Sequence, residues 1–286
     1  MGTGVLMSSR RTALVTGASR GIGKATAIAL AAGGFDVACT ARTLHRGEGR
    51  DDSDVGAGAM IAGSLEETAE EVEALGVRSM SVFADVTDSD SMTVAANTVL
   101  EEWGHVDVLV NNAIYTGPGG MVPLLELTVE QLRTRLEGNV VAQLVMTQAV
   151  VPTMIARGAG TVVNVSSHVA VGDPPAPVGS GGWGFGYAAS KAAFHKMAAM
   201  LAIELGDQGI QAFNVDPGFV DTEKQIANAA RNGLAGHYVG APPSVPATVI
   251  AWLASSPESG QFSGQLVRAQ KVALERDLHP DWRGQR

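Results

Sequence analysis

The sequence has almost no cysteine, a deficit of basic residues and no long apolar run, and each shortage excludes a class of protein. A single cysteine, Cys39, in 286 residues cannot form a disulfide within the chain, so a reducing, cytoplasmic location is expected. The 20 lysines and arginines are outnumbered by 29 acidic residues, which gives a formal net charge of -9. Because nucleic acid is bound by basic surfaces, it is excluded as the main partner.

Membrane spans and metal centres are not expected either. No uninterrupted apolar run reaches the roughly 18 residues typical of a membrane span. The start of the chain, MGTGVLMSSRRTALVTG, lacks the apolar core and cleavage pattern of a signal peptide. No His, Cys and Asp residues have metal-ligand spacing, and the acidic run at 66–73 is typical of a solvated helix face.

What is present is an alternation of apolar runs with helical patterns. The runs are continuously apolar, which is typical of a parallel sheet covered by helices on both faces. We therefore predict one doubly wound α/β domain over 12–270, with a flexible arm at 1–11 and a tail at 271–286. Its mostly parallel sheet has seven strands, expected at 12–17, 35–42, 78–85, 106–112, 160–167, 210–218 and 264–270. Helices are expected at 23–34, 64–76, 88–104, 128–157, 187–208 and 246–256, with Pro152 bending the long one.

The stretch TGASRGIG, residues 16–23, follows the first strand and opens the first helix. Gly17, Gly21 and Gly23 allow a tight turn, close approach of the backbone to a pyrophosphate and close helix–strand packing. The helix N-terminus adds unpaired N–H groups and a partial positive charge. This placement predicts a Rossmann-type dinucleotide site, in which Ser19, Arg20 and Ile22 belong to the same turn. The alternative is a Gly-rich turn without a ligand.

The end of the second strand indicates which dinucleotide is bound. An acid at this point would bind the 2′-hydroxyl of NAD, whereas an arginine accommodates the 2′-phosphate of NADP. Here the strand ends in Ala41 and Arg42, and Arg20 lies in the Gly-rich turn. Two guanidinium groups favour a phosphate, so NADP(H) is preferred and NAD(H) stays possible. The alternative is that both arginines are simply solvated.

The stretch YAASK places Tyr187 and Lys191 one helical turn apart, about 5–6 Å between Cβ atoms. A free phenol has a pKa of about 10 and is a weak acid near neutrality. A positive charge one turn away favours the phenolate and lowers that pKa. The pair therefore predicts a proton donor with a tuned pKa, and the alternative is an ordinary surface pair.

Seven motifs in order carry a family resemblance over residues 11–270. They are TGASRGIG, ADV at 84–86, NNA at 111–113, Asn139 in the long helix, VVNVSS at 162–167, YAASK, and PGFVDT at 217–222. On these motifs the chain resembles the short-chain dehydrogenase/reductase family. The resemblance implies a catalytic tetrad of Asn139, Ser167, Tyr187 and Lys191, with Lys191 also holding the nicotinamide ribose and Asn139 fixing a water that relays protons to Lys191.

The resemblance also implies further cofactor contacts. Asp85 and Val86 are implied at the adenine, and Asn111 and Ala113 beside the cofactor. The residues implied to flank the nicotinamide are Pro217, Gly218, Val220 and Thr222. Ser167 ends a strand, so its hydroxyl can hydrogen-bond the substrate oxygen over the crevice.

Several features depart from the family pattern. Ile114 replaces the glycine of NNAG, so the loop on the cofactor side must be shaped differently. The separation of Ser167 from Tyr187 is enlarged by the Pro/Gly-rich segment 168–186, whose Trp183 and Phe185 either face the substrate or anchor the loop. The Gly- and Asp-rich segment 46–63 is expected to be a surface loop, and the C-terminal tail lies over either a neighbouring subunit or the active site.

The expected function is transfer of a hydride between NADP(H) and a ketone or secondary alcohol, with Tyr187 as the proton donor or acceptor. This is the activity of a carbonyl reductase, with a small-molecule carbonyl or alcohol as substrate. The alternatives are an enoyl reductase or epimerase of the same family and a non-catalytic NADP(H)-binding sensor. The family default of a homodimer or homotetramer places the helices 128–157 and 187–208 at the interface.

Overall fold

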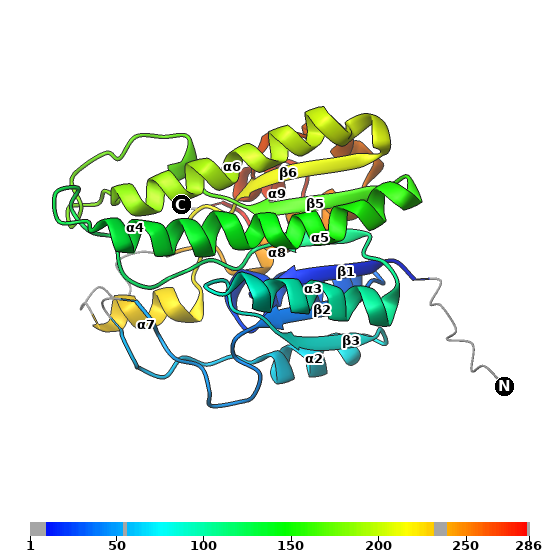
Figure 1. Ribbon diagram of the computed structural model, residues 1–286, viewed down its shortest axis with the longest axis horizontal. Coiled ribbons are helices and arrows are strands. Elements are labelled where there is room, and N and C mark those ends of the chain that lie inside the picture. The colour runs from blue at the N-terminus through cyan, green and yellow to red at the C-terminus, as the bar shows by residue number, and fades with distance from the viewer. Residues whose placement is uncertain (1–9, 54–55, 232–238, 285–286) are drawn as a thin grey trace.

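A computed structural model describes residues 10–53, 56–231 and 239–284, so most of the predicted arm at 1–11 lies outside the described residues. All seven predicted strands form one parallel sheet in the order β3-β2-β1-β4-β5-β6-β7 (Figure 1). The strands are β1 Thr12–Thr16, β2 Asp36–Ala41, β3 Ser79–Phe83, β4 Val108–Asn111, β5 Gly160–Val165, β6 Ile210–Asp216 and β7 Leu266–Arg268. The predicted doubly wound α/β fold is confirmed.

Helices cover both faces of the sheet. On one face, a hydrophobic core is formed with α1 Gly21–Ala32, α2 Leu65–Glu73, α8 Ser244–Ser255 and α9 Ala269–Glu275. On the other face, a second core is formed with α3 Ser89–Trp103, α5 Ala142–Arg157 and α6 Phe185–Leu205. Successive residues of a strand alternate between the two cores: Ala13 and Val15 pack on one side and Leu14 on the other. Burial on both faces explains why the strands are apolar without interruption.

The predicted long helix at 128–157 is interrupted near its middle, before Pro152. Helix α4, Val129–Leu136, passes through a π-helical turn at Glu137–Val141 into α5, which continues as α-helix past Pro152. Single π turns of this kind are frequent at functional sites, and this one contains Asn139. Among the described residues, the run Val129–Arg157 is the one helix long and apolar enough to cross a membrane, but 44% of its apolar 18-residue window is buried inside the fold. Core helices share this property, so it is weak evidence for a span.

The segment 46–63 is a folded hairpin in its described part. Arg50 and Met60 form an antiparallel bridge, flanked by hydrogen bonds from Asp51 N to Ala59 O (2.8 Å) and from Ile61 N to Gly49 O (3.1 Å). It connects β2 to α2 and is far longer than the ~4–6 residues of most connections. The 46–63 hairpin lies beside α7, Glu223–Arg231, on the side of the sheet where the strands have their carboxyl ends (Figure 1).

The C-terminal residues lie against the domain and brace the loop after β6. Gln270, in α9, donates from Nε2 to the carbonyls of Pro217 (3.0 Å) and Phe219 (2.8 Å). Trp282 is buried against the same core as α8 and donates from Nε1 to the Gln270 carbonyl (3.0 Å). Residues of the segment 271–286, separated as a tail in the sequence, therefore support the loop that the resemblance places at the nicotinamide.

Trp282→Ala should lower the free energy of unfolding by about 3 kcal/mol, because it removes a large buried side chain and leaves a cavity. Urea unfolding followed by circular dichroism measures this effect. Arg283→Ala is the matched control, since that side chain is 68% exposed and should change stability by less than about 0.5 kcal/mol. Equal stability of the two variants would show that the C-terminal residues do not support the domain.

Candidate active site

Ser167 and Tyr187 meet at the carboxyl edge of the sheet. Strand β5 ends two residues before Ser167, and α6 begins two residues before Tyr187. The Ser167 side chain is close enough to the Tyr187 phenol to lower its pKa through hydrogen bonding. The neighbouring Ser166 is buried and its hydroxyl lies 3.1 Å from Nδ1 of His195. The structure therefore brings Ser167, and not Ser166, to the predicted proton donor.

Lys191 lies one turn along α6 from Tyr187 and is buried. Its Nζ donates to the carbonyl of Val165, the last residue of β5, at 2.7 Å. Burial lowers the pKa of Lys191 to about 7, and the nearby Asp216 carboxylate opposes this shift. Near neutrality the ammonium and the neutral amine are both populated, so Lys191 can exchange a proton in that range.

The pKa of Tyr187 is raised in this structure, whereas the sequence predicts that Lys191 lowers it. Burial is the main cause, since it disfavours the charged phenolate. The hydrogen bond with Ser167 acts in the opposite direction, Asp216 raises the pKa further, and Arg135 lowers it. The expected direction is wrong because an isolated helix leaves both side chains hydrated, whereas the folded site removes water from them.

Three buried polar side chains on one helix hold the segment that follows β4. Asn139 accepts from the Tyr115 amide at 2.7 Å, and Gln143 donates to the Ala113 carbonyl at 2.9 Å. Arg135 donates to the carbonyls of Tyr115 and Gly117. We call Arg135, Asn139 and Gln143 the polar ladder. It determines the path of residues 113–117, which include Ile114 in place of the family's glycine.

Asn139 has a second contact that ties the polar ladder to the catalytic helix. Its Nδ2 donates to Ser190 Oγ at 3.0 Å, and Ser190 precedes Lys191 in α6. The resemblance implies that Asn139 fixes a water beside Lys191. In the structure both polar atoms of its side chain are engaged with protein groups, Tyr115 and Ser190, so its visible role is to join two elements of the site.

Arg135 is a functional candidate that sequence reasoning missed. The residue is 5% exposed, and its guanidinium lies 5.5 Å from the centre of the Tyr115 ring. Glycines make room for it: a Cβ on Gly120 would stand 2.4 Å from Nη2 of Arg135. The available signals were its position four residues before Asn139 and the Gly-rich segment 117–120. A buried cation near Tyr187 stabilises negative charge there.

The Gly-rich turn has the geometry of a phosphate cradle. Gly17 and Gly21 have φ of +66° and +56°, which favour glycine. A Cβ on Gly23 would stand 2.2 Å from the Gly17 carbonyl, so close packing requires glycine there too. The Gly21 amide donates to Oε2 of Glu223 at 2.9 Å. A carboxylate thus occupies the helix N-terminus as a phosphate oxygen would, and the turn fits a dinucleotide.

The other predicted cofactor residues fall into two groups. The first group lies in segments that follow strands at the carboxyl edge of the sheet: Ser19 and Ile22 in the turn after β1, Asp85 and Val86 after β3, Ala113 after β4, and Pro217, Gly218, Val220 and Thr222 after β6. Asn111 differs, because it is fully buried in β4 and donates to Thr147 and Asn164, each at 3.0 Å. Its side chain holds strands and helix together.

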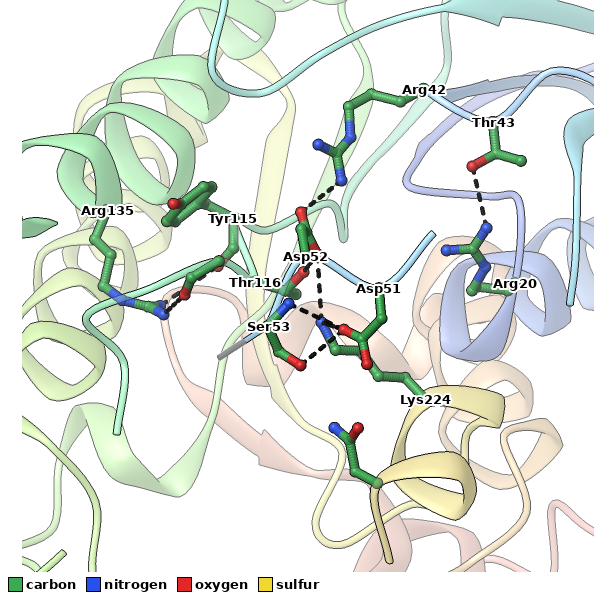
Figure 2. A network of polar contacts seen from close by, with 12 residues as sticks. Arg20, Arg42, Thr43, Asp51, Asp52, Ser53, Tyr115, Thr116, Arg135 and Lys224 are labelled. Carbon is green, nitrogen blue, oxygen red and sulfur yellow. Dashed lines mark hydrogen bonds and ion pairs between the residues drawn. The ribbon is translucent and has the colours of Figure 1, made fainter. Parts of the chain in front are cut away.

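The two arginines predicted for the 2′-phosphate are both bound to the 46–63 hairpin or its flank. Arg42 forms a 2.7 Å ion pair with Asp52 (Figure 2). Arg20 donates from Nη2 to Thr43 Oγ1 (3.0 Å) and from Nε to the Ala62 carbonyl (3.0 Å). The cations therefore lie at the predicted edge of the sheet, but they are not simply solvated. Asp52 and Glu223, their neighbours at this edge of the sheet, were not singled out from the sequence.

The segment 168–186 leads from Ser167 to α6. It begins with a 3₁₀ turn at His168–Ala170. Ser167 caps this turn, because its Oγ accepts a hydrogen bond from the Val169 amide at 3.3 Å. Trp183 is half-buried and Phe185 is about half exposed at the start of α6. A Cβ on Gly184 would stand 2.4 Å from the Gly120 carbonyl, so this segment packs tightly on the loop that Arg135 supports.

Arg135→Met should raise the pKa of Tyr187 further, because it removes the positive charge that favours the phenolate. The measurement is the tyrosinate absorbance titration, with the signal of the same variant carrying Tyr187→Phe subtracted. Arg135→Lys keeps the charge and should titrate close to the wild type. Gln143→Met removes another member of the polar ladder without a charge and should leave the Tyr187 pKa unchanged. A shift in Gln143→Met as large as in Arg135→Met would attribute the effect to the loop and not to the charge.

Comparisons with known proteins agree with this geometry. The model of the short chain dehydrogenase group matches residues 11–232. A short chain dehydrogenase of Pseudocercospora fijiensis is 34% identical over 227 residues, 79% of this chain and 65% of that protein. The 3-oxoacyl-(acyl-carrier-protein) reductase FabG of Thermotoga maritima is 32% identical over 262 residues, 90% of this chain and 95% of that protein.

A solved structure is similar over nearly the same extent. L-sorbose reductase from Gluconobacter frateurii, in complex with NADPH and L-sorbose, has a TM-score of 0.74 and 26% sequence identity, and the match covers 91% of this chain and 96% of that one. A single family assignment accounts for the sheet order, the Gly-rich turn after β1 and the Ser–Tyr–Lys arrangement. The chain belongs to the short-chain dehydrogenase/reductase family of NAD(P)-dependent oxidoreductases.

Proposed function

We propose that this protein is an NADP(H)-preferring carbonyl reductase that interconverts a ketone and a secondary alcohol. The observation that carries the proposal is the meeting of Ser167 and Tyr187 at the carboxyl edge of the sheet, the edge that also holds the Gly-rich cradle, with Lys191 buried one turn away from Tyr187. A carbonyl oxygen that reaches both hydroxyls would receive a hydrogen bond from Ser167 and a proton from Tyr187. The bound dinucleotide supplies or accepts the hydride.

The pKa directions favour reduction near neutral pH. Because burial raises the pKa of Tyr187, its phenol stays protonated and is available as an acid. Alcohol oxidation instead needs the phenolate as a base, which this site populates only at higher pH. Lys191, with a pKa of about 7, is suited to pass a proton back to Tyr187. The Asn139–Ser190 bond fixes the helix that carries both groups.

The preference for NADP(H) is supported by Arg42 and Arg20, which lie at the end of β2 and in the Gly-rich turn. No acidic residue ends β2, so the usual partner of a free ribose 2′-hydroxyl is missing there. The similar L-sorbose reductase was solved with NADPH. The expected cytoplasmic location belongs to the same proposal.

A homodimer or homotetramer is also proposed. Helices α5 and α6 present exposed apolar side chains, among them Leu144, Met200 and Ile203. These lie on the helices for which the resemblance predicts an interface, and an oligomer would remove them from water.

Tyr187→Phe should reduce carbonyl reduction with NADPH by about 10²–10⁴-fold, because it removes the proton donor. The assay follows NADPH and NADH oxidation across ketones, aldehydes and enones. Tyr115→Phe is the matched control and should retain turnover. Turnover of enones alone would favour an enoyl reductase, and cofactor binding without any turnover would favour a sensor. Undiminished carbonyl reduction by Tyr187→Phe would rule out Tyr187 as the donor.

Arg42→Met should weaken NADPH binding roughly 10-fold and leave NADH binding nearly unchanged, since charge-assisted hydrogen bonds contribute about 1.5–3 kcal/mol. Dissociation constants from cofactor fluorescence measure both. Arg46→Met provides a control on the adjoining 46–63 hairpin: its side chain is exposed to a similar degree as that of Arg42 (47% against 46%), and its partners are Glu66 and Glu70. An equal loss for both cofactors in Arg42→Met would remove Arg42 from 2′-phosphate recognition.

A further inference from the structure

Asp52 lies where four separate parts of the cofactor edge converge. It belongs to the 46–63 hairpin, and its partners come from the end of β2, from the loop after β4 and from the first turn of α7 (Figure 2). The carboxylate pairs with Arg42 at 2.7 Å, accepts a hydrogen bond from Thr116 Oγ1 and lies 3.5 Å from Lys224 Nζ. One side chain therefore bridges the edge of the sheet that the dinucleotide occupies in a Rossmann-type site.

The Asp52 carboxylate is ionised and competes well for these donors. Burial raises its pKa, but the hydrogen bonds from Thr116 and Arg42 outweigh burial and hold the pKa below its ordinary value. Its side chain is 28% exposed and that of Arg42 is 46% exposed, so the ion pair is partly shielded from water. A second anion brought to Arg42 would be repelled by Asp52 at short range.

Asp51 anchors the hairpin and thereby positions Asp52. The Asp51 carboxylate is buried and pairs with Arg231 at 2.7 Å and with Lys224 at 3.2 Å. Gly56 is required beside it, since a Cβ there would stand 1.9 Å from Oδ2 of Asp51. In the described part of the chain, the side-chain partners of Asp51 are Ser53, Lys224 and Arg231. The two neighbouring acids therefore have different roles: Asp51 binds α7, and Asp52 reaches the end of β2.

We propose that Asp52 is a specificity-determining residue that competes with the 2′-phosphate of NADP(H) for Arg42, and so limits the preference for NADP(H) over NAD(H). The inference rests on the proposed function, because it requires a nicotinamide dinucleotide to bind at this edge of the sheet. NADP(H) must share or displace the Arg42–Asp52 ion pair. NAD(H), with a 2′-hydroxyl in place of the phosphate, brings no second anion to Arg42 and can donate a hydrogen bond to Asp52.

The test is the ratio of the NADH to the NADPH dissociation constant, measured by cofactor fluorescence in the wild type and in Asp52→Asn. Asparagine keeps the shape and can still accept from Thr116, but it removes the negative charge. The ratio should rise about 2- to 10-fold in favour of NADPH, the scale expected for exchange at a partly exposed ion pair. Asp52→Ser provides a second variant in case asparagine disturbs the hairpin, and it should shift the ratio in the same direction.

Two controls separate competition at Arg42 from general loss of charge. Glu48→Gln removes one charge from an exposed side chain of the same hairpin, which is bound to the His45 amide, and it should leave the ratio unchanged. In an Arg42→Met background, Asp52→Asn should alter the ratio less than it does in the wild type, because the contested guanidinium is gone and only direct contacts of Asp52 with the ribose substituent remain. The inference is wrong if the ratio stays constant or falls in both Asp52 variants, or if Asp52→Asn acts equally with and without Arg42.

The outcomes also distinguish this inference from the proposed function. Failure of the wild type to bind either cofactor would contradict the proposed function, and the inference with it. Binding of both cofactors with a ratio that ignores Asp52 would contradict the inference alone. A wild type that favours NADH, combined with a shift toward NADPH in Asp52→Asn, would contradict the proposed preference and support the inference.

Discussion

The hydrogen bonds from the polar ladder to the backbone of residues 113–117 are the constraint on which the rest of the site depends. Buried backbone groups need partners, and this segment has left the sheet that would supply them. Residues 135 and 143 are eight apart, a spacing that drifts about 80° around an α-helix. The π turn at Glu137–Val141 winds less per residue and keeps the three side chains of the ladder closer to one line. The ladder then fixes Thr116, which in turn binds Asp52.

Burial acts on the two central ionisable groups in opposite directions, and this is what makes the pair suited to proton transfer. It raises the pKa of Tyr187 and lowers that of Lys191 to about 7. Both shifts favour the neutral forms, the phenol of Tyr187 and the amine of Lys191. Asp216 raises both pKa values, whereas the Arg135 charge lowers that of Tyr187. The chemistry of the site is therefore set by residues of α4 and β6 as much as by the helix that carries YAASK.

The strands, the Gly-rich turn and the positions of Ser167, Tyr187 and Lys191 could be predicted because each is encoded by a contiguous pattern. Continuous apolar runs imply burial on both faces, and glycines between a strand and a helix imply a tight turn. The roles of Arg135 and Asp52 could not be predicted in this way. Their partners lie 18 and 64 residues away at Gly117 and Thr116, and no local pattern brings them together. The direction of the Tyr187 pKa failed for a related reason, since burial is a property of the folded site.

Carboxylates of the chain itself already bind donors at the predicted cofactor edge of the sheet. Glu223 accepts from the Gly21 amide, and Asp52 pairs with Arg42, so two donors expected to bind a dinucleotide already hold anions. Leaving such partly buried donors without partners would be unfavourable, and the carboxylates remove that cost. Binding of the dinucleotide is then an exchange of one set of anions for another, and only the difference between the two sets appears as affinity. Because both acids lie on the 46–63 hairpin and α7, outside the Gly-rich turn and the catalytic helix, affinity for the cofactor can be adjusted there without altering the Gly-rich turn or the catalytic residues.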